Sequence, residues 1–204
     1  INGYTKDTAP IFSPNAIGGY MPAKPMDLSD KKSPDEQVSP SSVQMALSRG
    51  YIVASIGARG RTLQKDGVYT GKAPAAIVDL KAGIRYLKAN DKQMFGDANK
   101  IIVNGTSAGG AMTALLGATG NHPDYEMELQ KIGAIRAKDN VFAVSSYCPI
   151  TNLENADAAY EWQMNKINDY KKITIKSLDY QVKRETISGT LDKNSQDLSL
   201  QLKQ

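Results

Sequence analysis

The chain has 204 residues, of which 41% are hydrophobic and 23% charged, a composition typical of a folded globular protein rather than a disordered chain or a coiled coil. Its 25 basic and 21 acidic residues are interspersed, so the net charge of +4 does not indicate a nucleic-acid-binding surface. A single cysteine excludes a disulfide bond within the chain, and no apolar run approaches the roughly 18 residues that a membrane-spanning helix requires.

The first quarter of the sequence contains two strand candidates separated by a loop and a helix. Residues 10–13 are a short extended candidate, and four prolines among the charged residues 22–40 indicate an exposed loop. A serine-capped helix is predicted over residues 41–49, ending at Gly50. The nearly continuous apolar run 51–56 is typical of a strand buried on both faces.

The alternation of helices and strands continues through the middle of the chain. A helix is predicted with Pro74 in its first turn. After Pro74, apolar residues recur at spacings of three and four. This spacing places four of them on one face of the helix: Ile77, Leu80, Ile84 and Leu87. A second buried strand is predicted at 101–103 and a third strand at 141–147, with an alanine-rich helix over 108–119 between them.

Strands that alternate with helices imply right-handed crossovers and a parallel sheet covered on both faces. We therefore predict an α/β fold in which residues 1–150 form the N-terminal part of the core. Residues 151–204 are polar and rich in lysine and aspartate, and we expect mostly helical segments outside the sheet, as an insertion or the start of a second unit. For residues 185–204 a disordered tail is the competing interpretation.

Residues 105–109 (Gly-Thr-Ser-Ala-Gly) match the Gly-x-Ser-x-Gly nucleophile elbow of serine hydrolases. In that turn the serine lies between a strand and a helix, and side chains two positions away on either side would clash. We therefore expect Ser107 to be a catalytic nucleophile and the Ala108 N–H to donate to the oxyanion. A glycine-rich turn of a dinucleotide-binding domain is the alternative, but no Gly-x-Gly-x-x-Gly pattern or acidic ribose partner accompanies it.

The second oxyanion donor in this fold comes from the loop after an earlier strand. The segment 17–20 (Ile-Gly-Gly-Tyr) follows the predicted strand 10–13 at that place. Of its two glycines we choose Gly19 as the donor, because a glycine backbone can turn its N–H toward the serine. An ordinary flexible turn is the alternative interpretation.

A serine hydroxyl is a poor nucleophile without a base, and in this fold the base is a histidine that follows the serine and the acid along the chain. The one histidine here, His122, follows the predicted nucleophile helix, which would carry it to the far end of the domain. We therefore expect a surface or loop-anchoring role for it. The triad acid and base then come from a missing C-terminal segment or a second chain, or the protein is an inactive relative.

Several other residues receive structural interpretations. Arg59 and Arg61 follow a predicted strand, and one of them is expected to fix the loop in which they lie. Asp79 and Lys81 are expected to be exposed or to form local ion pairs. Cys148 has no obvious base nearby in the sequence and is expected to be a buried structural thiol.

Six segments resemble the bacterial tannases (tannin acylhydrolases), a family of α/β-hydrolases. They are residues 3–12, 14–22, 57–61 (Gly-Ala-Arg-Gly-Arg), 104–110 (Asn-Gly-Thr-Ser-Ala-Gly-Gly), 116–121 and 147–153. The resemblance runs from about residue 2 to residue 165. It is much more specific than the serine motif alone.

The resemblance implies an α/β-hydrolase core with a large lid inserted after the strand that follows the nucleophile helix, in agreement with the change of composition near residue 150. It also implies hydrolysis of galloyl esters through an acyl-enzyme on Ser107, with Ala108 and Gly19 as oxyanion donors and with no metal or organic cofactor. The triad aspartate and histidine of the family, and its lid residues that bind gallate, have no counterparts here. This chain alone is therefore expected to be inactive.

Two other functions stay open, namely a feruloyl or general carboxylesterase and a catalytically inactive hydrolase-like binding domain. The expected partner is a small aromatic ester, and neither nucleic acid nor a membrane is expected to bind. The sequence starts at Ile1 without a signal-peptide pattern, so we interpret it as trimmed and assign no compartment.

Overall fold

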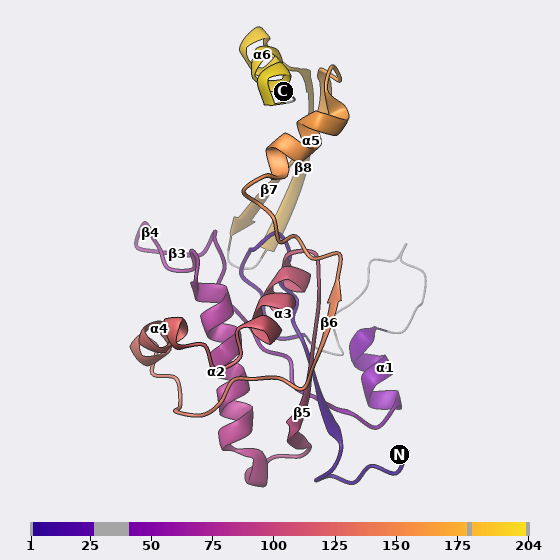
Figure 1. The fold of residues 1–204 in the computed structure, drawn as a ribbon, viewed down its shortest axis with the longest axis vertical. Coiled ribbons are helices and arrows are strands. Elements are labelled where there is room, and N and C mark those ends of the chain that lie inside the picture. The colour runs from indigo at the N-terminus through magenta and orange to yellow at the C-terminus, as the bar shows by residue number, and fades with distance from the viewer. Residues whose placement is uncertain (1, 27–40, 179–180, 203–204) are drawn as a thin grey trace. The chain divides into compact units, whose positions relative to one another are not determined.

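The computed structural model describes residues 2–26, 41–178 and 181–202, with the side chains of residues 175–184 excepted. It divides into two compact units, Ile1–Pro149 and Ile150–Gln204, which are drawn together in Figure 1. The division lies next to the predicted boundary at residue 150. That the second unit begins a lid stays a prediction.

The first unit is built on four parallel strands in the order β2-β1-β5-β6. The strand β1 (Pro10–Pro14) pairs with β2 (Ile52–Val53) on one side and with β5 (Asp97–Thr106) on the other. The last strand, β6 (Ala143–Tyr147), pairs with β5. This parallel sheet confirms the predicted α/β fold of the α/β-hydrolase type.

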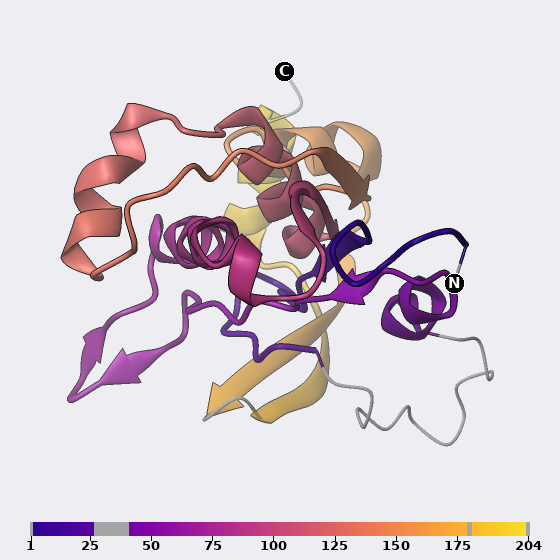
Figure 2. The same cartoon turned by 90° about the horizontal axis from the view of Figure 1, so that it is seen from below.

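Helices lie on both faces of the sheet. Figure 2 shows α2 (Ala75–Ala89) and α3 (Ala108–Ala118) on one face and α1 (Ser42–Ser48) on the other. The serine cap predicted for α1 is present, because Ser41 Oγ accepts a hydrogen bond from the Gln44 N–H at 3.2 Å. The predicted bounds of α1 (41–49) and α3 (108–119) lie within one residue of the observed ends, and Pro74, predicted in the first turn of α2, lies directly before its first residue.

The core lies between the sheet and the α2–α3 face. Alternate residues of β5, Ile101 and Val103, point to this side and are buried, as expected for a strand with two faces. The predicted apolar face of α2 meets them, and its four members are almost fully buried: Ile77, Leu80, Ile84 and Leu87. The periodicity of the sequence thus correctly identified the buried face of this helix.

The sheet is less completely covered than predicted. Of the apolar run 51–56 only Ile52 and Val53 pair as a strand, and the run is half-buried because β2 is the edge strand of the described sheet. On the α1 side, residues of β5 and β6 line an open cavity. The prediction of a strand buried on both faces is therefore wrong for this run.

Short elements complete the first unit. A short hairpin precedes α2; its strands β3 (Gln64–Lys65) and β4 (Val68–Tyr69) have two residues each. The 3-10 helix η1 (Asp91–Gln93) lies before β5. After α3 come the 3-10 helix η2 and the helix α4, at Pro123–Tyr125 and Glu126–Lys131.

The second unit differs from the mostly helical segment that was predicted. It contains α5 (Ala156–Met164) and α6 (Lys193–Leu202), but β7 (Asp169–Leu178) and β8 (Gln181–Thr190) form an antiparallel hairpin between them. Alternating β-branched residues such as Ile173 favour strands over helices, and this signal outweighs the polar composition. A disordered tail over 185–204 is also wrong for the described residues, because β8 and α6 occupy them.

Two side-chain predictions are wrong as well. Lys81 is neither exposed nor in a local ion pair: it is fully buried, and its ammonium group donates to the carboxylate of Asp139, 58 residues away, at 2.8 Å. Cys148 is exposed rather than buried. It follows the last residue of β6, at the edge of the described sheet, where no further strand covers it among the described residues.

Lys81 belongs to a buried ion cluster that joins three parts of the first unit. Arg85, one helical turn further along α2, also donates to the Asp139 carboxylate at 2.8 Å and pairs with Glu126 of α4. The Asn121 N–H donates to the same carboxylate at 2.7 Å. Burial alone would raise the pKa of Asp139, but the hydrogen bonds from Lys81, Asn121 and Arg85 outweigh it and hold that pKa below its ordinary value.

Substitution Asp139→Asn is expected to lower the free energy of unfolding by about 3–5 kcal/mol, because two buried cations lose the carboxylate that compensates them. Urea unfolding of the wild-type protein and the variant measures this difference. The control Asp7→Asn changes an exposed carboxylate and is expected to stay within about 0.5 kcal/mol of the wild type. Equal stability of the two variants would contradict the structural role of the cluster.

Candidate active site

The strand order creates a switch point at the carboxyl ends of β1 and β5. The chain leaves β1 toward β2 at one edge and then returns to the other side of β1 to form β5 and β6. Connections from the two neighbouring strands therefore diverge, which opens a crevice beyond their carboxyl ends where ligands bind in open α/β sheets. Ser107 follows β5 at this place, and the loop with Gly18 and Gly19 follows β1.

Ser107 is the single residue between β5 and α3, and it is exposed. Its backbone has φ of 59° and ψ of −122°, a sparsely populated conformation that persists only where surrounding contacts hold it. Two hydrogen bonds do so, from the Ser107 N–H to the Tyr147 carbonyl at 2.9 Å and from the Ala111 N–H to the Ser107 carbonyl at 3.0 Å. The turn thus has the geometry that the motif predicts.

The glycines of the motif are required by close packing. A Cβ on Gly105 would overlap the carbonyl oxygen of Gly109. A Cβ on Gly109 would lie 2.5 Å from Asn15 Oδ1 and 2.8 Å from the Ile17 carbonyl oxygen, well inside van der Waals contact. These contacts also show that the loop after β1 crosses directly over the first turn of α3.

Asn15 fastens this loop to the elbow. Its Nδ2 donates to the carbonyl oxygens of Asn104 and Gly109 at 3.0 and 3.3 Å and to Thr113 Oγ1 at 2.9 Å. Its Oδ1 accepts from the Ile17 N–H at 3.3 Å. No role was predicted for Asn15, although a polar residue directly after a strand, at the edge where ligands bind, is a usable signal.

The loop then turns sharply at Gly18–Met21. The Met21 N–H donates to the Gly18 carbonyl at 3.0 Å, and both central residues have positive φ, 56° at Gly19 and 57° at Tyr20, as in a type I′ turn. In a trans peptide the N–H points opposite to the carbonyl of the same unit. The Gly19 N–H therefore points away from the turn, and within the described residues it has no hydrogen-bond partner.

Ala108 is the first residue of α3 and is buried. The first N–H groups of a helix have no acceptor within the helix and carry its positive dipole end. The backbone N–H after Ser107 is thus available at the place where an anion bound beside the serine would be stabilised.

His122 lies at the far end of α3 from Ser107, beyond a helix of about 16 Å. Its Nδ1 accepts a hydrogen bond from the Asp124 N–H at 3.4 Å, which caps η2. The predicted loop-anchoring role is therefore observed. Among the described residues no acid or base side chain forms a hydrogen bond with the Ser107 hydroxyl.

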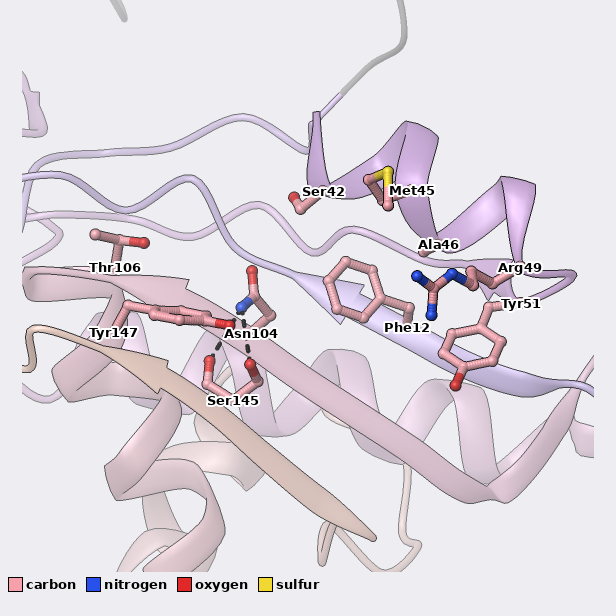
Figure 3. Close-up of a pocket in the computed structure, with 10 residues that line it drawn as sticks. All are labelled: Phe12, Ser42, Met45, Ala46, Arg49, Tyr51, Asn104, Thr106, Ser145 and Tyr147. Atoms are coloured by element: carbon pink, nitrogen blue, oxygen red, sulfur yellow. Dashed lines mark hydrogen bonds between the residues drawn. The ribbon is translucent and has the colours of Figure 1, made fainter. Parts of the chain in front are cut away.

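A cavity of about 550 Å³ lies on the α1 side of the sheet. Figure 3 shows its lining side chains, which come from α1 and from the faces of β1, β5 and β6 turned toward it. Thr106 and Tyr147, at the carboxyl ends of β5 and β6, lie at one end of it, and Arg49 and Tyr51 at the other. Ser107 is not among the lining residues, so the cavity does not identify the substrate site.

In the part of the chain that the structure describes, no group of three or more His, Cys, Asp and Glu side chains could hold a metal ion. No helix there is both long and apolar enough to cross a membrane.

The whole chain is similar to solved tannases. The family model BD-FAE matches residues 28–188. A tannase from Fusobacterium nucleatum is 53% identical with a TM-score of 0.85, and a tannase from Lactobacillus plantarum is 48% identical with a TM-score of 0.82. Both matches cover 100% of this chain and 43% of the tannase chain, so the chain spans less than half of their length. The predicted resemblance to bacterial tannases is confirmed.

Two other matches bear on the chemistry of the site. A tannin acyl hydrolase solved in complex with ethyl gallate is 49% identical with a TM-score of 0.78, over 100% of this chain and 42% of that chain. Esterase LipC of Mycobacterium tuberculosis is 46% identical over 56 residues, which are 28% of this chain and 14% of LipC.

Substitution Asn15→Ala is expected to destabilise the protein by about 1–3 kcal/mol, because buried polar atoms such as Thr113 Oγ1 lose their partner. Chemical unfolding monitored by circular dichroism measures this loss. The matched control is Asn99→Ala, which changes an exposed asparagine of β5 and is expected to cost less than about 0.5 kcal/mol. A similar cost for both would show that Asn15 does not hold the loop.

Proposed function

The chain belongs to the BD-FAE family, and we propose that the protein is a serine ester hydrolase that cleaves galloyl or related hydroxybenzoyl esters. Ser107 is its proposed nucleophile. The observation that supports this most strongly is the backbone of Ser107, exposed in a strained turn between β5 and α3. A turn that costs of order 1–3 kcal/mol is retained in a fold where it has a function.

The proposed reaction has two halves. A general base accepts the proton of the Ser107 hydroxyl while its oxygen bonds to the ester carbonyl carbon, which gives a tetrahedral oxyanion. Collapse of that intermediate breaks the bond to the alcohol, which leaves with a proton from the base, and an acyl-enzyme remains. Water then attacks the acyl carbon by the same route, releases the acid and restores the serine.

The oxyanion is proposed to accept hydrogen bonds from the N–H groups of Ala108 and Gly19. Ala108 offers the positive end of α3, and Gly19 offers an N–H that is turned outward from its loop. Each such donor contributes about 3 kcal/mol to the lowering of the barrier. Asn15 supports this arrangement, because it ties the loop that leads to Gly19 to the first turn of α3.

We assign the triad aspartate and histidine to residues outside these 204, on a further segment or a second chain, because His122 lies at the wrong end of α3. The second unit is assigned as the start of a lid. The chain by itself is then inactive. No metal or organic cofactor takes part in the proposed reaction.

The proposed galloyl substrate rests on the similarity to solved tannases, one of them in complex with ethyl gallate and another with 3,4-dihydroxybenzoate. Both ligands have a hydroxylated benzoyl ring. The match to Esterase LipC favours a general carboxylesterase as the second candidate, with the same nucleophile and a different acyl group.

Full-length protein is expected to react covalently with a fluorophosphonate probe at Ser107, and Ser107→Ala is expected to abolish the labelling and to lower kcat by about 10⁴-fold or more. Mass spectrometry of the labelled peptide and ester hydrolysis measure these effects. The control Ser48→Ala removes an exposed hydroxyl of α1 and should change neither. Failure of the wild type to react, with no activity lost in Ser107→Ala, would instead indicate an inactive binding domain.

Among ester substrates, methyl gallate is expected to have a kcat/KM at least about a hundredfold above that of methyl ferulate, because a site that hydrogen-bonds several ring hydroxyls discriminates strongly against an analogue that lacks some of them. Initial rates with both esters and with p-nitrophenyl acetate measure the preference. A higher kcat/KM for methyl ferulate would favour a feruloyl esterase, and equal values for all three a general carboxylesterase.

A further inference from the structure

The segment 57–61 lies against the glycine loop that follows β1. The N–H groups of Ala23 and Ala58 each donate to the carbonyl of the other at 2.9 Å, which forms an antiparallel bridge. Three residues further along, the Arg61 N–H donates to the Tyr20 carbonyl at 2.8 Å. Backbone hydrogen bonds thus join the two loops along their length.

Close packing fixes the distance between the two loops. A Cβ on Gly60 would overlap the backbone of Met21 and Pro22. Only a residue without a side chain can bring the two backbones together in this way. The loop that contains Gly19 therefore takes its position from segment 57–61.

Segment 57–61 is in turn fixed to α2 by Arg59. The Asp79 carboxylate accepts from the Arg59 N–H at 2.8 Å, and its two oxygens accept from the guanidinium at 2.7–3.1 Å. The hydrogen bond to Asp79 raises the pKa of Arg59 further above its ordinary value, so the group stays charged. A bidentate pair of this kind defines orientation as well as distance.

Arg61 reaches the tip of the glycine loop. Its Nε donates to the Gly19 carbonyl at 2.8 Å. The peptide before this one is held by the hydrogen bond from the Met21 N–H to the Gly18 carbonyl. Both carbonyls of the turn are therefore occupied, and each fixes the plane of its peptide. The Gly19 N–H lies in the plane of the Gly18–Gly19 peptide, and the Arg61 hydrogen bond fixes the next plane, which is joined to the first at the Gly19 Cα. Loss of the Arg61 hydrogen bond would let the Gly19–Tyr20 peptide turn and the loop shift, which would displace the Gly19 N–H.

We propose that Arg61 is a positioning residue for the oxyanion hole, acting through the Gly19 carbonyl rather than on the substrate. The inference rests on the proposed ester hydrolysis. The guanidinium holds the turn from outside, and the Gly19 N–H receives the developing charge on the ester oxygen. A displacement of this donor by about 1 Å is enough to lower the rate by about a hundredfold.

The kinetics of an Arg61 variant distinguish this role from substrate binding. Substitution of a side chain that contacts the aromatic ring would change the kinetics only for esters whose ring carries the group that it recognises. It would change mainly KM. A side chain that orients an oxyanion donor acts on kcat for every ester, because the donor is used in the transition state of each.

The test compares Arg61→Ala with wild type in the full-length protein, with methyl gallate and p-nitrophenyl acetate as substrates. We expect kcat to fall about ten- to hundredfold for both esters while KM changes less than about twofold. Arg136→Ala, which removes an exposed arginine of the first unit, is expected to keep wild-type values. Arg61→Met retains the aliphatic stem and should lose kcat as Arg61→Ala does, which provides the measurement if the alanine variant does not fold.

Three results would overturn the proposal: an unchanged kcat in Arg61→Met, a loss confined to methyl gallate, or a loss confined to KM. A wild type that cleaves p-nitrophenyl acetate but not methyl gallate contradicts the galloyl substrate alone, and the role of Arg61 is then decided on the acetate. A wild type that cleaves neither ester overturns both proposals together.

Discussion

At Ser107 the backbone turns out of β5 and into α3 with φ of 59° and ψ of −122°. This turn depends on how β5, α3 and the loop after β1 pack together. It exists because β5 and α3 approach so closely that positions 105 and 109 have no room for a side chain. The same approach lets Asn15 reach both elements at once. Sheet, helix and loop therefore meet at one serine, whose hydroxyl is left exposed.

The predictable parts of this arrangement are those that depend on residues close together in the sequence. Periodic apolar residues identified the buried face of α2, and the glycines around Ser107 identified the elbow, because both patterns act over a few residues. The partner of Lys81 lies 58 residues away, and local pattern carries no information about such a pair. The sequence therefore indicated an exposed lysine where the fold contains a buried one.

Contacts to backbone atoms set another limit on prediction. Arg61 donates to a carbonyl oxygen, and Asn15 donates to two carbonyl oxygens besides Thr113 Oγ1. Every residue has a carbonyl oxygen, so the sequence does not signal these contacts. The exposed position of Cys148 and the hairpin of the second unit were missed for a different reason. Those two predictions came from composition and from single residues, whereas the pairing of strands determines where these residues lie in the fold.

The buried ion cluster imposes an order of assembly on the growing chain. Lys81 and Arg85 lie on α2, whereas Asp139 is made only after α3 and α4 and just before β6. A cation without its counter-charge stays in water rather than entering an apolar core. Full docking of α2 must therefore wait until residue 139 has left the ribosome, which couples the closure of the helical layer to the arrival of β6 at the sheet.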